Sequence, residues 1–325
     1  MQIKIISFFL LMIIVACSNQ VSDRTNSDAF PGVDLNLEPN MSRAMPIVDI
    51  AKEENTGYGP SIEIPQSYIE EKKSIHMPVI GVILGPGLYR VIAHIQILKA
   101  FKKNDINVNV IAGIGISSIV AALYATGDTP DKIEWIFHKF FNQIKDYPPY
   151  SSSWILKAKQ ELIDLHPWKT IEELDLLTTL PSYSELDNQY NYTNRGNLKQ
   201  VLEENLIFLS TDGKELGKFN IYDVSVFHKL GVDILIGIDI LNNKIKFDTM
   251  SDISIHKFNQ ISNLSFSQKG QLSLYLDPPI DDMSLDSLDN LPEYTLKTFE
   301  YGNIISLKIK TAISGWQERT NVDLE

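Results

Sequence analysis

Residues 78–127 read PVIGVILGPGLYRVIAHIQILKAFKK and then NDINVNVIAGIGISSIVAALYATG, and this stretch decides the fold. It contains two short runs that are almost entirely apolar, Val79–Leu84 and Val108–Ala112. Such runs are typical of strands that are covered on both faces of a parallel sheet. A glycine turn and a helical pattern follow each run. Repetition of strand, turn and helix predicts an α/β fold with a parallel central sheet.

The helical patterns place the other elements of this fold. Apolar residues recur at intervals of four, three and three from Val91 to Phe101, which predicts a helix that ends near Lys103. A second apolar helix is expected over 117–126, where Gly127 closes it. A third buried strand is expected over Ile234–Ile240.

Composition excludes several classes of function. The 325 residues carry a formal net charge of −12, so no basic surplus is available to neutralise nucleic-acid phosphates. The single cysteine, Cys17, excludes an internal disulfide and a zinc site built on cysteines. No two of the six histidines lie within five residues of each other. We therefore expect neither a metal site nor a cofactor.

The first residues have the pattern of an export signal. Lys4 precedes an apolar run over 5–15, which is shorter than the about 20 residues that span a bilayer. The run ends in Ile14-Val15-Ala16-Cys17, which resembles the lipobox of bacterial lipoproteins. The resemblance implies a signal peptide over 1–16 and a lipid on Cys17 that anchors the chain to a membrane. The alternative is a cleaved secretory peptide with a chance cysteine.

The residues after Cys17 suggest where the chain resides. Ser18 stands where an aspartate favours retention in the inner membrane, so we expect the outer membrane of a bacterial cell envelope. Residues 17–77 are polar and aperiodic, which predicts a flexible tether between the lipid and the folded domain.

Two chemistries use a glycine turn between a buried strand and a helix. In dinucleotide binding, the pattern Gly85-x-Gly87 should continue to a third glycine, but Arg90 occupies that position. In acyl transfer, backbone N–H groups of the turn hold an oxyanion, and a nucleophile stands at a second strand-to-helix elbow.

The segment Ile80–Gly127 resembles the start of the patatin-like phospholipase domain. The matching stretches are LGPGLYRV (84–91), AHIQILKA (93–100) and IAGIGIS (111–117), with no gap needed between them. A second block fits Gly231-Val232-Asp233, which lies sixteen residues after Glu215. The resemblance covers about 78–312, leaves 313–325 as a tail, and implies a three-layer α/β/α fold with a mostly parallel central sheet.

The same resemblance identifies the positions of the catalytic residues. In the family, a serine in G-x-S-x-G is the nucleophile and an aspartate of an Asp-Gly turn activates it; here these positions hold Gly115 and Glu215. The resemblance places the oxyanion loop at Gly85, Pro86, Gly87 and Arg90. Pro86 has no N–H to donate.

These departures imply a retained fold that has lost acyl-ester hydrolysis and acts by binding an acyl lipid or an envelope protein. The alternative is an active serine acyl hydrolase that uses a displaced serine, Ser117 or Ser118, with the acid supplied by Asp212 of Asp212-Gly213 after an insertion. More simply, Ser117 is expected to cap the helix that it begins, and Asp212-Gly213 to form a turn.

Other prominent residues have two interpretations each. Arg90 either polarises a substrate oxygen or forms a surface ion pair, and His94 is expected to be a packing residue rather than a base. The aromatic residues Trp135, Phe137, Phe140 and Phe141 are expected in the core, with contact to a bilayer as the alternative. The acidic stretch 281–289 is expected to be a solvated loop, because it lacks the spacing of a calcium loop.

Overall fold

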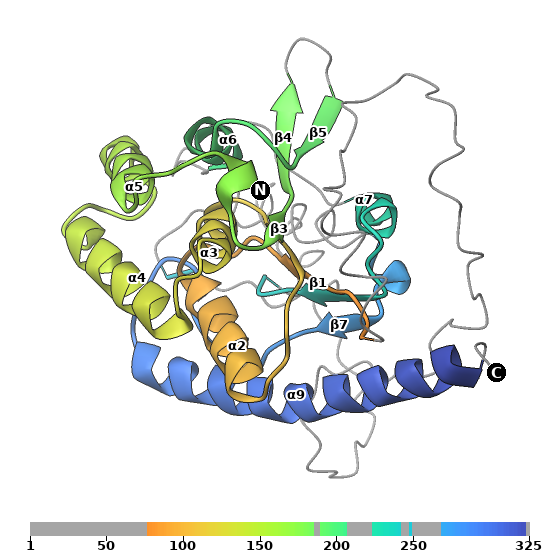
Figure 1. Ribbon diagram of the computed structural model, residues 1–325. Helices are drawn as coiled ribbons and strands as arrows, with labels where there is room; N and C mark the ends of the chain where they lie inside the picture. The colour runs from red at the N-terminus through yellow and green to blue at the C-terminus, as the bar shows by residue number, and fades with distance from the viewer. Residues whose placement is uncertain (1–76, 185–188, 207–222, 242–246, 249–267, 323–325) are drawn as a thin grey trace, which may run out of the picture. The chain divides into compact units, whose positions relative to one another are not determined.

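The computed structural model describes residues 77–184, 189–206, 223–241, 247–248 and 268–322 (Figure 1). The strands are β1 (Ile80–Leu84), β2 (Val110–Gly113), β3 (Leu177–Thr178), β4 (Leu180–Ser184), β5 (Gln189–Thr193), β6 (Ile234–Ile238) and β7 (Leu274–Leu276). The α-helices are α2 (Ile92–Lys103), α3 (Ile116–Ala125), α4 (Pro130–Ile144), α5 (Ser152–Asp164), α6 (Leu198–Asn205), α7 (Val224–Lys229) and α9 (Leu291–Val322). Short 3-10 turns are η1 (Leu88–Val91), η2 (Ile171–Glu173) and η3 (Lys269–Gln271).

The central sheet has five strands in the order β3-β2-β1-β6-β7, and every neighbouring pair is parallel. Strands β4 and β5 form a separate antiparallel pair. The α/β class and the parallel sheet predicted from the sequence are therefore confirmed. Because all five strands run the same way, the ends of β1, β2 and β6 meet at one edge of the sheet.

Alternate side chains of β1 are buried in two different hydrophobic cores. Val82 and Leu84 join the larger core, which α2, α3, α4, α5 and α9 complete. Ile83 faces the smaller core, which includes Phe227 of α7. Burial on both faces explains why the sequence of β1 is continuously apolar, and it produces the expected three layers.

The longest described helix, α9, packs against α2, which crosses it in Figure 1. A Cβ atom built on Gly302 would stand 2.7 Å from Cβ of Ala100 and 3.2 Å from Cα of Ile97. The two backbones approach closely because this position has no side chain. The expected tail from residue 313 begins inside α9, which continues to Val322.

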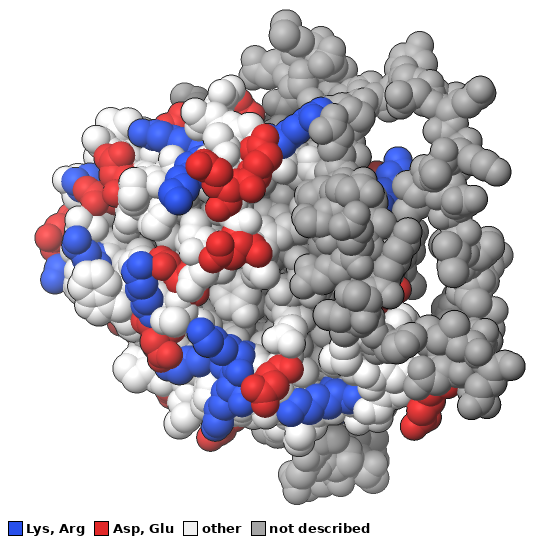
Figure 2. All heavy atoms as spheres, viewed as in Figure 1, with Lys and Arg blue, Asp and Glu red and all other residues white. Residues whose placement is uncertain are grey.

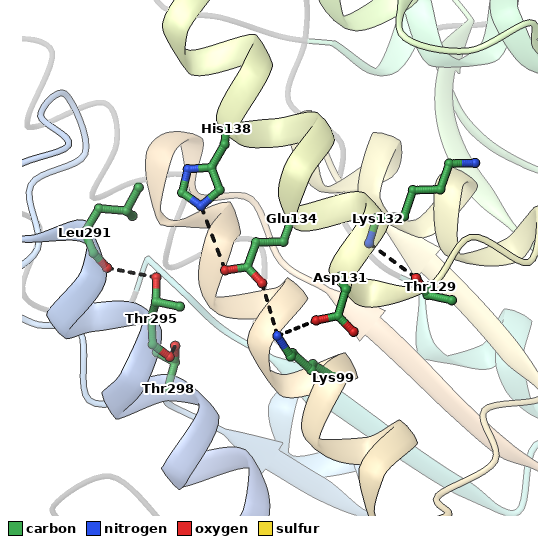
Figure 3. Close-up of polar contacts among 9 residues, drawn as sticks. All are labelled: Lys99, Thr129, Asp131, Lys132, Glu134, His138, Leu291, Thr295 and Thr298. Carbon is green, nitrogen blue, oxygen red and sulfur yellow. Dashed lines mark hydrogen bonds and ion pairs between the residues drawn. The ribbon is translucent and has the colours of Figure 1, made fainter.

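Polar contacts join α2 to α4 at the surface (Figure 3). Nζ of Lys99 lies 2.5 Å from Asp131 and 3.4 Å from Glu134, and these contacts raise the pKa of Lys99, the hydrogen bond to Asp131 most of all. His138 approaches the other oxygen of Glu134 at 3.8 Å. Figure 2 shows basic and acidic side chains interspersed over the viewed face. No helix within the described ranges is long and apolar enough to cross a bilayer.

The structure corrects several sequence expectations. The second strand begins at Val110 rather than at 108, and the first helical segment opens with the turn η1. Phe137, Phe140 and Phe141 lie in the core as expected, but Trp135 is 64% exposed. Helix α4 turns these three rings inward, and Trp135 points away on its opposite face, where Nζ of Lys139 lies 5.9 Å from its ring centroid.

Candidate functional site

The elbow between β2 and α3 is the centre of the site. Gly115 has φ 60° and ψ −132°. Residues with a side chain rarely adopt this backbone conformation, whereas glycine adopts it freely. A Cβ atom built on Gly113 would lie 2.3 Å from the carbonyl oxygen of Ser117, so packing requires glycine there. Gly115 is buried, yet no described heavy atom lies within 4 Å of a Cβ built on it. Apart from its two chain neighbours, no described residue fills the position that a side chain at 115 would take.

Ser117 and Ser118 are fully buried and have backbone partners. Oγ of Ser117 donates a 2.7 Å hydrogen bond to the carbonyl oxygen of Gly85, and Oγ of Ser118 donates one of 2.6 Å to that of Gly115. Ser117 does not supply a side-chain cap to α3, whose N-cap position is Gly115, so the expected capping role is wrong. Both hydroxyl protons are directed at carbonyl oxygens inside the protein.

Asn205, the last residue of α6, also reaches this elbow. Its side chain is fully buried, and Oδ1 accepts a 2.8 Å hydrogen bond from the N–H of Gly115. The sequence pattern did not single out Asn205. A polar residue at the end of a helix reads as an ordinary surface position, and the chain brings it to the elbow from 90 residues away.

The first glycine turn, after β1, has little room for side chains. A Cβ atom built on Gly87 would lie 2.3 Å from the side chain of Ile240. The backbone at Gly87 passes so close to Ile240 that a residue with a side chain does not fit. Leu88 has φ 52°, a left-handed conformation that is unusual for leucine, and it is buried. In the family a glycine occupies the position of Leu88, and Pro86 brings no N–H to the turn.

Arg90 is completely buried, which rules out the surface ion pair considered above. Its guanidinium donates to the carbonyl oxygens of Met283 at 2.7 and 2.9 Å, of Leu241 at 3.0 Å and of Ile240 at 3.2 Å. Burial lowers its pKa to about 10, so it remains a cation near neutral pH. Arg90 thereby joins the segment after β6 to the segment before α9 rather than pointing to a substrate.

His94 is a buried packing residue, as the sequence analysis expects. Nε2 lies 2.8 Å from the carbonyl oxygen of Gly85, which can only accept, so Nε2 carries the proton. Burial lowers the pKa of His94 to about 4, and the imidazole is neutral at physiological pH. His94 and Ser117 thus hold the same carbonyl group and fix the entry to the glycine turn.

The acidic stretch 281–289 is more ordered than the expected solvated loop. Asp286 is 4% exposed; its carboxylate accepts from the hydroxyl of Ser284 at 2.5 Å and from the N–H of Asp248 at 2.7 Å. Asp282 and Asp289 are exposed. No group of three or more metal-ligating side chains occurs within the described ranges.

The second catalytic block is described only in part. Asp233 accepts a 2.8 Å hydrogen bond from the N–H of Val79, and it joins the start of β6 to the start of β1. Glu215, Asp212-Gly213 and Cys17 lie outside the described residues. The described part of the site is therefore a strand-to-helix elbow with glycine at position 115, beside a glycine turn in which Pro86 has no N–H.

Residues 82–299 match the family described as Patatin-like phospholipase. The match spans most of the chain, and the chain belongs to the patatin-like phospholipase family. Solved structures with a matching chain share little sequence with it. One is VipD from Legionella pneumophila, with 7% identity over 73% of this chain and 67% of that chain, and a TM-score of 0.40.

Another is full-length SpcU in complex with full-length ExoU from Pseudomonas aeruginosa. There the identity is 11% over 70% of this chain and 53% of the matching chain, with a TM-score of 0.35. This protein thus spans about half the length of the chain that it matches in that complex.

Proposed function

We propose that this protein is a non-hydrolysing member of the patatin-like family that binds an acyl lipid at the vacated elbow. One observation carries the proposal: Gly115 keeps a positive-φ elbow conformation, and no described residue other than its chain neighbours occupies the space of a side chain there, although Gly115 is buried. Ile114 and Ile116, on either side of Gly115, are buried apolar residues. The family's description as phospholipase supports an acyl lipid as the ligand.

The loss of hydrolysis is supported by the two serines that the alternative requires. Neither Ser117 nor Ser118 is exposed, and the hydroxyl of each donates a hydrogen bond to a backbone carbonyl oxygen. A carbonyl oxygen does not take up the proton as a catalytic base does. Loss of a serine nucleophile in a hydrolase lowers turnover by about 10⁶-fold. Binding without turnover is the function that such a site retains.

The proposal includes a lipid anchor on Cys17 and a place in the bacterial outer membrane. Its support is the apolar run over 5–15 and the small residues before Cys17. Stable anchoring takes more than one acyl chain, which a diacylglyceryl group on the thiol provides. The anchor would hold the domain near acyl lipids.

Binding of a fluorescent fatty acid to the purified protein tests the proposed function. Gly115→Leu fills the open space and is expected to weaken binding by on the order of tenfold or more. Gly196→Leu is the matched control, because Gly196 also has a positive φ, of 99°, and open space around its Cβ position. Absence of binding by the wild type, or equal loss in both variants, contradicts the proposal.

A further inference from the structure

We infer that Asn205 is the positioning residue of the elbow: it holds the backbone at position 115 in its positive-φ conformation. The inference concerns the backbone and holds whether or not the site binds lipid. It rests on the contacts of one fully buried side chain with three separate segments of the chain.

Residue 115 does not hold this geometry by itself. Glycine adopts positive φ about as readily as negative φ, so Gly115 gives the elbow no steric preference for φ 60° and ψ −132°. The turn hydrogen bonds of the elbow, from the N–H groups of Ser117 and Ser118, go to the carbonyl oxygens of Ile114 and Gly115. These bonds fix the start of α3 and leave the N–H of Gly115 to be bound from elsewhere.

The side chain of Asn205 binds that N–H group. The donor is buried at the junction of a strand and a helix, and a buried donor without a partner is unfavourable. Oδ1 of Asn205 accepts from it at 2.8 Å. The peptide plane before Gly115 is thereby fixed by a group that comes from α6.

The rest of the amide fixes Asn205 itself. Nδ2 donates to the carbonyl oxygen of Pro181 at 2.9 Å, and it lies 3.4 Å from that of Gly113. Carbonyl groups only accept and the N–H of Gly115 only donates, so the amide has one orientation that satisfies all three. Helix α6 packs against both β4 and α3, which gives the side chain a rigid base (Figure 1).

Two substitutions separate the acceptor of Asn205 from its volume. Asn205→Leu keeps the size and removes the acceptor. Asn205→Asp keeps an oxygen facing the N–H of Gly115, and burial keeps the carboxyl protonated, so its O–H replaces the donation of Nδ2 to Pro181. Ser306→Ala is the control, because the hydroxyl of Ser306 is also fully buried but donates within α9, to Gly302. Each variant is made in the full chain.

The measurement is hydrogen exchange at the amide of Gly115, compared with amides of β1 and β2 in the same protein. In the wild type we expect slow exchange at Gly115. Asn205→Leu is expected to accelerate it by on the order of tenfold beyond any change in the two strands, while Asn205→Asp and Ser306→Ala leave that ratio unchanged.

A general loss of stability accelerates exchange at Gly115 and in the strands alike, and that result overturns the inference. Fast exchange at Gly115 in the wild type also overturns it, and this result needs no variant. If Asn205→Leu does not fold, the wild type and Asn205→Asp decide: faster exchange at Gly115 relative to the strands in the aspartate variant counts against the acceptor role.

Discussion

At the scale of single residues, two positions near the site have positive φ, and they differ in whether that conformation is strained. Gly115 has φ 60° without strain, because it has no Cβ, whereas Leu88 has φ 52° with a branched, buried side chain. A left-handed conformation costs a non-glycine residue about 1–2 kcal/mol. The elbow is thus relaxed at Gly115, whereas the glycine turn is strained at Leu88.

Leu88→Gly is predicted to be more stable than Leu88→Ala by about 1 kcal/mol, although both lose the buried leucine side chain. The reason is that alanine keeps the left-handed strain and glycine removes it. Urea unfolding of the two variants measures the difference. At Lys102, in the last turn of α2, the order should reverse, with alanine more stable by about 1 kcal/mol. The same order at both positions would show that Leu88 is unstrained.

His94 predicts a pH dependence of stability. Its pKa is about 4 in the folded protein against 6.5 as the ordinary value, so the unfolded chain binds more protons between these two pH values. The contribution of His94 is fully present above about pH 7, falls as the pH is lowered to about 4, and amounts to about 3 kcal/mol. Unfolding of wild type and His94→Gln across this range measures it, and parallel curves for the two proteins contradict the prediction.

How far the sequence predicts individual residues depends on where their partners lie. The glycine elbow at 113–115 follows from local pattern, because strand, turn and helix are contiguous. The role of Arg90 does not, since its acceptors are carbonyl groups that lie 150 or more residues away in the chain. The same holds for Asn205. Glu215 stays a prediction, as do Cys17 and its lipid.

At the scale of secondary structure, the packing of α9 on α2 depends on one residue without a side chain. The sequence predicts α2 from its apolar periodicity, but no local pattern reveals which face of α9 packs on α2 and needs a glycine. The approach of Gly302 to Ala100 and Ile97 is visible only in three dimensions. A close-packed contact between two helices tolerates added atoms poorly.

Gly302→Ala is therefore predicted to destabilise the protein by about 1–3 kcal/mol, because its methyl group would overlap α2. Gly315→Ala is the control in the same helix. No described atom lies within 4 Å of a Cβ built on Gly315, so alanine there should stabilise by up to about 1 kcal/mol through helix propensity. Thermal unfolding compares the two, and equal effects would show that helix propensity, not packing, governs both positions.

At the scale of the whole molecule, the proposed lipid anchor on Cys17 precedes the patatin-like domain. Cys17→Ala is predicted to move the protein from the membrane fraction to the soluble fraction, or to leave an unprocessed precursor in the membrane, because the diacylglyceryl thioether cannot form. Cell fractionation followed by intact-mass analysis distinguishes these results. Wild-type protein found entirely in the soluble fraction would contradict the anchor.

Covalent labelling with a fluorophosphonate tests most directly whether the fold persists without a nucleophile. The wild-type protein, measured by intact mass after prolonged exposure, is predicted to gain no adduct, because its described site has glycine at the elbow and the neighbouring serines are buried. An adduct mapped to Ser117 or Ser118, and abolished when that serine is replaced by alanine, would contradict the claim and establish an active hydrolase.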